Sequence, residues 1–355
     1  MSVTADSVWN ATDTTPDAIE QALRRLLVEQ HAEQPDALPA RVLNLVAVVD
    51  KAWSGEIANR LRRVGRYQPS RTIVLQVDPG RTELDATVSV ATHEGETLAL
   101  ARELVIVDVG PQHLAHADSI VDPLVVTDLP TMCWAPHGHP EAIDALLRLA
   151  QIVLIDSIDE PDAGLALARA ADLVEKEAIV VDLAWLRSTP WRERVAALFD
   201  PPSMRPQLHR ISGLTVRHEA GSGVAALLFV GWLASRLGWT PTPLVPDVTG
   251  GRAGTLTAHR QDVHVELTAV PLSTRGLGGV TVETADGTSI ALDRGLGGLD
   301  AVRRDLRGGA ETECRWTIMG ASRGEGGILG EGIRQALLRD PTYVPSLRAA
   351  RGLVA

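Results

Sequence analysis

A histidine-rich segment follows a short apolar run in the first half of the chain. It contains Cys133, His137 and His139, and sulfur and nitrogen ligands of this kind bind zinc tetrahedrally. No CxxC or HxxxH spacing accompanies them, and a fourth ligand would have to come from His113 or His116. We therefore expect no metal. His137 and His139 are predicted to lie in a loop at the carboxyl end of a strand, where α/β sheets bind ligands or partners.

A basic segment connects a predicted helix to a predicted strand. It contains Arg66, Tyr67, Ser70 and Arg71. Guanidinium groups match the oxygens of a phosphate, so the segment is a candidate for binding a phosphate or a partner. The alternative interpretation is a polar connection in which an arginine starts the strand.

Two glycine clusters precede predicted helices, at 221–223 and 320–327, and the second contains Ser322 and Arg323. Backbone N–H groups at a helix N-terminus favour anions, which makes both clusters candidate phosphate sites. Neither has the spacing of a P-loop, and no G-x-G-x-x-G follows a strand of the first half with an acid about 20 residues on. Tight turns are the plainer interpretation, and no cofactor is predicted.

An acidic cluster follows the predicted strand 151–156, at Asp156, Asp159, Glu160 and Asp162. It could hold Mg²⁺ together with a substrate phosphate, but capping of the next helix is favoured. The chain has no G-x-S-x-G nucleophile motif, and its two cysteines lie in different halves. We therefore expect no catalytic set and no redox pair, and hence that the protein is not an enzyme.

The composition excludes several classes of protein. Of 355 residues, 45% are hydrophobic and 22% are charged, which is typical of a globular protein and not of a disordered one. The net charge of -11 argues against nucleic-acid binding, which needs a basic face. The longest apolar run, 224–234, is shorter than the about 20 residues of a membrane-spanning helix. With no signal peptide in the first residues, a cytoplasmic protein without a membrane partner is expected.

The two halves of the chain differ in charge and in glycine content. Residues 1–202 hold 31 acidic and 17 basic side chains, and residues 203–355 hold 14 and 17. Only 7 of the 31 glycines lie in the first half. A proline-rich segment at 200–206 separates the halves. We predict one domain at 1–202, with a flexible segment at 1–14, and a glycine-rich domain at 203–355.

Hydrophobic periodicity predicts different architectures for the two halves. The first alternates strands and helices, which indicates an α/β domain with a mostly parallel sheet and an inserted hairpin at 84–93 and 98–109. In the second, a strand at 209–218 and an apolar helix at 224–237 precede a series of short strands. This indicates an α+β domain with an antiparallel sheet, with strands expected at 243–248, 254–259, 262–269, 279–283, 288–292 and 311–319, and a helix at 326–338.

Tryptophan is unusually frequent, with 8 residues against 2 phenylalanines and 2 tyrosines. Because tryptophan is enriched at protein interfaces, Trp53, Trp185 and Trp191, which lie near polar helix starts, are predicted surface residues. Trp232 and Trp239 flank the apolar helix and are predicted core residues. For Trp134, beside the histidine segment, both a core position and a partner contact remain open.

Six segments, in order along the chain, resemble the glucose-6-phosphate dehydrogenase assembly protein family, OpcA, of actinobacteria and cyanobacteria. They are RVLNLV at 41–46, VGRYQPSR at 64–71, IVDPLVVTDL at 120–129, WAPHGHP at 134–140, QIVLIDS at 151–157 and GWLASRLGW at 231–239. The arginine-rich composition is similar to the actinobacterial branch. The resemblance implies a non-catalytic partner that assembles and allosterically activates glucose-6-phosphate dehydrogenase in the oxidative pentose phosphate pathway.

An alternative remains open. The first half could be an enzyme or sensor for a phosphorylated sugar or a nucleotide, with Arg66, Arg71, His137 and His139 in its site. A small phosphorylated metabolite is accordingly a second candidate partner. Redox control, which is discussed for cyanobacterial relatives, would have only Cys133 and Cys314 to act through.

Overall fold

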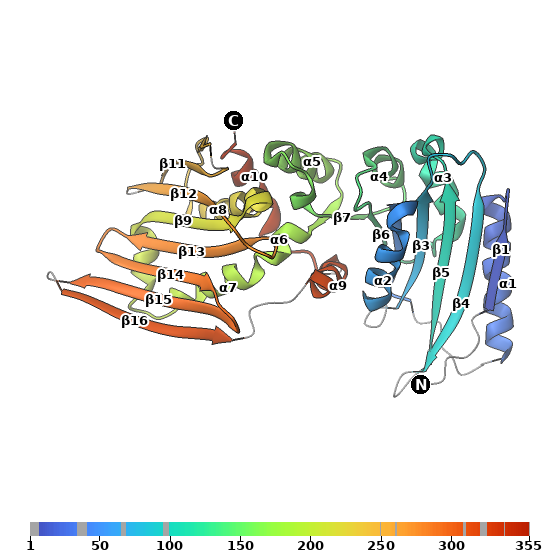
Figure 1. Cartoon of the computed structure of the whole chain (residues 1–355), viewed down its shortest axis with the longest axis horizontal. Helices are drawn as coiled ribbons and strands as arrows, with labels where there is room; N and C mark the ends of the chain where they lie inside the picture. The colour runs from blue at the N-terminus through green and yellow to red at the C-terminus, as the bar shows by residue number, and fades with distance from the viewer. Residues whose placement is uncertain are drawn as a thin grey trace. The chain divides into compact units, whose positions relative to one another are not determined.

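The computed structural model describes residues 7–33, 41–64, 69–94, 99–248, 250–259, 261–307, 310–319, 325–336 and 338–354. The chain forms two compact units, each containing one eight-stranded sheet (Figure 1). The first unit comprises Met1–Ile155, Lys176–Val181 and Leu329–Leu338, and the second comprises Asp156–Glu175, Asp182–Ile328 and Arg339–Ala355. The proline-rich segment 200–206 thus belongs to the second unit. The predicted domain boundary at residue 202 stays a prediction.

The sheet of the first unit is mostly parallel. Its strand order is β1-β4-β5-β3-β2-β6-β7-β8, with bounds β1 Ser7–Ala11, β2 Leu43–Asp50, β3 Ser70–Val77, β4 Asp85–Glu94, β5 Ala99–Val109, β6 Thr131–Trp134, β7 Ile152–Ile155 and β8 Ile179–Asp182. The central strands β2, β3, β5, β6 and β7 are parallel to their neighbours in this series. The predicted hairpin is formed by β4 and β5, which pair in antiparallel fashion. The almost unbroken apolar sequence of β2 is explained by its burial along nearly its whole length.

The edge of this sheet differs from the expectation for residues 1–14. Ser7–Ala11 form β1, which pairs antiparallel with β4 over Ala86–Val90. The side chains of β1 alternate between half-buried and exposed. A strand of this kind is held by backbone pairing with a partner distant in sequence, so its own composition gives a weak signal.

Helices cover the sheet of the first unit. They are α1 Pro16–Glu33, α2 Ser54–Val64, α3 Ala117–Val121 and α4 Pro140–Leu146, with single-turn helices η1 Lys51–Trp53, η2 Pro111–His116 and η3 Asp122–Leu124. α1 begins at Pro16, and the Thr15 hydroxyl before it accepts a hydrogen bond from the Ala18 N–H at 3.3 Å. Because β2→β3 and β6→β7 run in opposite directions across the sheet, right-handed crossovers place α2 and α4 on opposite faces.

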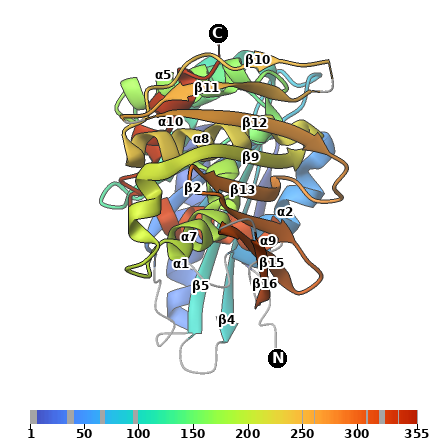
Figure 2. The ribbon, with the colours of Figure 1, turned by 90° about the vertical axis from the view of Figure 1, so that its left-hand side faces the viewer.

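The sheet of the second unit is antiparallel except for one pair (Figure 2). Its order is β10-β11-β12-β9-β13-β14-β15-β16, and only β9 and β12 run parallel. The bounds are β9 Ile211–Glu219, β10 Val245–Pro246, β11 Arg252–Thr257, β12 Asp262–Val270, β13 Leu277–Thr284, β14 Thr288–Arg294, β15 Gly298–Arg307 and β16 Ala310–Met319. The predicted fold class, an α/β unit followed by a mostly antiparallel α+β unit, is confirmed.

One face of this sheet packs against helices. The helices and helical turns of this unit are η4 Ser157–Asp159, α5 Ala163–Glu175, α6 Leu183–Arg187, α7 Thr189–Leu198, η5 Arg205–Arg210, η6 Ala220–Ser222, α8 Gly223–Leu237 and α10 Tyr343–Arg351. Most of α9 Glu325–Ala336 belongs to the first unit. The sequence did not predict β15, α6 or α10. α8 contacts β9, β12 and α10. A Cβ at Gly231 would lie 2.3 Å from the Ser346 carbonyl oxygen, so only glycine permits this approach of α8 to α10.

The stretch Ala220–Leu237 is long and apolar enough to cross a membrane by composition. In the structure it includes the central helix of the second unit, whose residues Val224–Val230 are buried without interruption. We therefore assign α8 to the core, as its all-round apolar sequence predicted.

Candidate functional site

The histidine segment lies where the sheet of the first unit changes direction. From β2 the chain proceeds to β3 on one side, and from β6 to β7 on the other, so the carboxyl ends of β2 and β6 mark the switch point at which open α/β sheets bind ligands. His139, after β6, lies 2.8 Å from the Asp50 carboxylate at the end of β2. The His137 Nδ1 accepts a hydrogen bond from the Asp50 N–H at 3.2 Å. Through these two contacts with Asp50, His137 and His139 hold the loop that follows β6 against the end of β2.

Four further residues, Lys51, Trp53, Asp78 and Asp108, complete this switch-point site. Lys51 Nζ donates to Asp78 at 3.0 Å and to Asp108 at 3.1 Å, two carboxylates that stand at the carboxyl ends of β3 and β5. The hydrogen bonds to Asp78 and then to Asp108 raise the pKa of Lys51, and the bond from Lys51 lowers the pKa of Asp78. The Trp53 ring lies 6.1 Å from the His137 ring, and Trp53 is 53% exposed.

The charge of the switch-point site is unsuited to a dinucleotide. A pyrophosphate bound at a switch point rests on a glycine-rich turn and a helix N-terminus. Here the turn after β2 is Asp50-Lys51-Ala52-Trp53, and Lys51 is held by two carboxylates. The carboxylates of Asp50, Asp78, Asp108 and Glu141 outnumber the two described cations near them, Lys51 and Arg81, and Arg81 is itself paired with Asp85. An anion would be repelled, whereas arginine or lysine side chains of a partner would be attracted.

A zinc site at Cys133 and the neighbouring histidines was considered from the sequence and was not expected. Within the ranges that the structure describes, no group of three or more His, Cys, Asp or Glu side chains is placed to hold a metal ion. Cys133 is buried in β6, and the adjacent Trp134 is 3% exposed. Trp134 is therefore a core residue, which decides between its two interpretations.

The described residues of the basic segment, Ser70 and Arg71, lie at the opposite end of the sheet. Ser70 and Arg71 begin β3, whereas the histidines follow the carboxyl end of β6. Arg71 is 9% exposed and donates to Glu103 at 2.6 Å and to the Leu124 carbonyl at 2.8 Å. Arg41 also pairs with Glu103. Arg71, which was predicted to bind a phosphate, therefore forms a structural ion pair. Its partner, Glu103, lies on the neighbouring strand β5.

Four predicted site residues, Arg66, Tyr67, Ser322 and Arg323, lie outside the described residues. The first glycine cluster is described. There Glu219 accepts hydrogen bonds from the Gly221 N–H at 3.0 Å and from the Ser222 hydroxyl at 2.8 Å. The Glu219 carboxylate thus occupies the position that a bound anion would take. Residues 221–223 form a turn, which is the plainer of the two interpretations of this glycine cluster.

Two of the three tryptophans predicted at the surface are buried. Trp185 and Trp191 are each 2% exposed. The Trp185 indole N–H donates to Asp340 at 2.8 Å, and the Arg192 guanidinium stacks over the ring at 3.5 Å from its centroid. The polar neighbours that suggested a surface position are thus partners of the buried ring. Trp239 is buried as predicted and Trp232 is half-buried.

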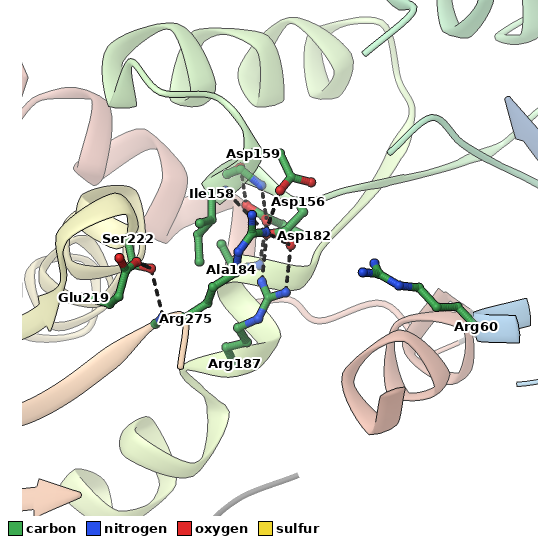
Figure 3. Close-up of polar contacts among 12 residues, drawn as sticks. Arg60, Asp156, Ile158, Asp159, Asp182, Ala184, Arg187, Glu219, Ser222 and Arg275 are labelled. Carbon is green, nitrogen blue, oxygen red and sulfur yellow. Dashed lines mark hydrogen bonds and ion pairs between the residues drawn. The ribbon is translucent and has the colours of Figure 1, made fainter. Parts of the chain in front are cut away.

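A second polar cluster, in the second unit, was not predicted as a unit. Asp156 and Arg187 form a buried two-point ion pair, with N–O distances of 2.8 and 2.7 Å (Figure 3). Arg275 lies 2.5 Å from Asp159 and 3.5 Å from Asp156. The acidic cluster therefore has two structural roles. Asp156 and Asp159 form ion pairs with arginines, and Asp162 caps α5 by accepting a hydrogen bond from the Leu165 N–H at 2.9 Å.

The centre of this cluster is Asp182, at the end of β8. Its carboxylate is fully buried and accepts hydrogen bonds from the Ser157 N–H and hydroxyl, the Ala184 N–H and the Tyr343 hydroxyl. Burial raises the pKa of Asp182 to about 6, and the neighbouring Asp156 charge acts in the same direction. Sequence reasoning missed Asp182 because its donors come from segments up to 161 residues away.

Comparison with solved structures supports the fold. Glucose-6-phosphate 1-dehydrogenase of Mycobacterium avium superposes with a TM-score of 0.56 over 88% of this chain and 91% of that chain, at 10% sequence identity. At this identity the similarity concerns the fold alone. It is the fold of a two-domain protein with a Rossmann-like unit and a mostly antiparallel second sheet.

Sequence comparisons give the family. Residues 62–172 match the model described as the glucose-6-phosphate dehydrogenase subunit N-terminal domain, and residues 178–344 match the corresponding C-terminal domain. The OxPP cycle protein OpcA of Synechocystis is 24% identical over 85% of this chain, and the protein of that name in Nostoc punctiforme is 31% identical over 46%. These matches span 66% and 36% of the two relatives' own lengths. The chain belongs to the OpcA family of glucose-6-phosphate dehydrogenase assembly proteins.

Proposed function

We propose that this protein is a non-catalytic assembly factor and allosteric activator of glucose-6-phosphate dehydrogenase, of the actinobacterial type and acting in the cytoplasm. The observation that carries the proposal is the match of both halves of the chain to the two OpcA family models. The charge of the switch-point site supports a non-catalytic role, because carboxylates and a held lysine stand where a dehydrogenase of this fold would bind a dinucleotide phosphate.

The mechanism that we propose is a shift of population. Binding of this chain favours the oligomeric or high-affinity state of the dehydrogenase, and the activation is limited by the difference in affinity for the two states. The acidic switch-point site, with the exposed Trp53 beside it, has the chemistry of a contact for a basic patch of the partner.

The alternative of a sugar-phosphate or nucleotide enzyme has less support. Of its four residues, Arg71 is held in a buried ion pair at the amino end of β3, and His137 and His139 are bound to Asp50 at the carboxyl end of β2. Residues at opposite ends of one sheet do not form one pocket. No observation on the described residues favours this function.

The proposal is tested by titrating the protein into the glucose-6-phosphate dehydrogenase of the same organism. NADPH formation is followed across a range of glucose-6-phosphate concentrations. We expect a saturable fall in the apparent KM or a saturable rise in kcat, and the midpoint gives the apparent affinity. An unchanged rate at a large molar excess, under both reducing and oxidising conditions, would contradict activation.

Replacement of Trp53 by alanine is expected to weaken binding to the dehydrogenase about 30-fold, the effect of losing an interface residue worth about 2 kcal/mol. The affinity is measured by the same titration and by surface plasmon resonance. Val28→Ala, which truncates another exposed apolar side chain of the first unit, is the matched control. Equal affinities for both variants would exclude Trp53 from the interface without affecting the proposal of activation.

A further inference from the structure

A groove in the second unit has the chemistry of a ligand site. It lies between α7, the segment that follows it and the strands β14–β16, and its volume is about 410 Å³. Pockets that bind small molecules have volumes of about 300–1,000 Å³ and combine apolar walls with a few polar groups. The groove is lined by both kinds of residue, and it is separate from the switch-point site and from the Asp182 cluster.

The apolar wall comes from both the sheet and the helix side. Ile290 of β14 and Met204 after α7 are buried, while Trp316 of β16 is 36% exposed. Trp316 pairs with the buried Ala301 of β15, so its ring lies on the face of the sheet that faces the core. Leu198 of α7 also lines the groove. A large apolar ring that remains partly exposed within a groove offers a surface on which a flat apolar group can stack.

Two guanidinium groups provide positive charge. Arg194 lies one helical turn before Leu198 on α7, and its Nε is buried without a hydrogen-bond partner. Within the part of the chain that the structure describes, Arg194 forms no ion pair. Arg303 of β15 also lines the groove, and its Nε is likewise buried without a hydrogen bond, but this atom forms an ion pair with the Asp305 carboxylate at 2.9 Å. Arg194 is therefore the uncompensated charge at the groove, and a buried donor without a partner is costly unless a ligand satisfies it.

We propose that this groove binds a small organic anion, in which an aromatic or other apolar group packs against Trp316 and Met204 and a carboxylate, sulfonate or phosphate pairs with Arg194. Guanidinium groups bind such oxyanions by charge-assisted hydrogen bonds, and a partly dehydrated groove strengthens them. The inference is independent of the proposed function, because it concerns the isolated chain. If the dehydrogenase is activated, such a ligand would give the activator a means of responding to a metabolite.

The test uses 2-naphthoate as the anionic probe and 2-naphthalenemethanol as its uncharged analogue, with calorimetric titration of the full-length protein. We expect 2-naphthoate to bind with a dissociation constant on the order of 0.1 mM, a value typical of a ligand of this size. The uncharged analogue is expected to bind about tenfold more weakly, because it lacks the pairing with Arg194.

Variants locate the site. Arg194→Gln is expected to weaken 2-naphthoate binding about tenfold and to leave the uncharged analogue unaffected. Trp316→Ala is expected to weaken both probes. Arg315→Gln is the matched control, since Arg315 is adjacent to Trp316 but points to the opposite face of the sheet and is 69% exposed. The proposal is overturned if 2-naphthoate does not bind, if both probes bind equally, or if Arg194→Gln and Arg315→Gln have the same affinity.

Discussion

Replacing Arg187 by methionine is expected to reduce the free energy of unfolding by about 3–5 kcal/mol, the cost of removing one member of a buried ion pair. The substitution leaves the Asp156 carboxylate buried, with Arg275 at 3.5 Å as its remaining cation. It also leaves Asp156 close to the buried Asp182, whose pKa the Asp156 charge already raises. The loss is measured by urea denaturation with tryptophan fluorescence, with the m value compared between variants.

The matched control is Arg275→Met. Arg275 is 47% exposed and its main partner, Asp159, is 38% exposed, so this pair is screened by solvent and is expected to contribute less than about 1 kcal/mol. The double variant Asp156→Leu/Arg187→Met removes both charges and should recover most of the stability, because no uncompensated charge remains. If Arg187→Met were no less stable than Arg275→Met, the buried pair would have no special role.

Replacing Asp182 by asparagine is expected to stabilise the protein above pH 6 and to have little effect near pH 4. The folded pKa of about 6 exceeds the unfolded value of 3.8. Between these values the unfolded chain has released the proton and the folded chain has kept it. Asp182 therefore destabilises the fold increasingly as pH rises through this window, by up to about 3 kcal/mol. Asparagine does not titrate, so the variant does not lose this free energy of unfolding as the pH rises.

The geometry allows asparagine to replace the carboxylate. The N–H groups of Ser157 and Ala184 both donate to Oδ1 of Asp182, which the amide oxygen retains. The hydroxyl groups of Ser157 and Tyr343 donate to Oδ2, and a hydroxyl can rotate to accept from an amide N–H instead. All four contacts therefore persist with the direction of two reversed.

The measurement is the free energy of unfolding of wild type and Asp182→Asn at pH 4.5, 6.0 and 7.5. The difference between the two proteins should grow in favour of the variant as the pH rises. Asp293→Asn is the control, because its carboxylate is 52% exposed and pairs with Arg217 at the surface. A difference that is the same at all three pH values would mean that titration of Asp182 is not its cause.

The local pattern of the sequence predicted much of the fold because the relevant signals are local. The apolar helix α8 and the hairpin of β4 and β5 each depend on residues within a few positions of one another. β15 was missed for the opposite reason. Its sequence, GLDAVRRDLR, contains five charged residues, and the strand is specified by its pairing with β14 on one side and β16 on the other.

The same distinction between local signals and distant partners separates the candidate residues that were placed correctly from those that were not. His137 and His139 were predicted at the carboxyl end of a strand, and the alternation of strands and helices is sufficient to place them there. Arg71 was given a binding role because its partner, Glu103, is 32 residues away and nothing in the sequence pairs them. Trp185 was assigned to the surface because its partner, Asp340, is 155 residues away.

The sequence by itself determined the order and type of most elements, the change from a parallel to an antiparallel sheet, and the family. Only the tertiary structure decided which charges are free. It pairs Arg71 with Glu103 and Arg187 with Asp156, buries Asp182 among four donors, and leaves the Nε of Arg194 without a hydrogen-bond partner among the described residues. The physical reason is that secondary structure follows from short-range backbone and hydrophobic patterns, whereas the compensation of a charge depends on side chains that only folding brings together.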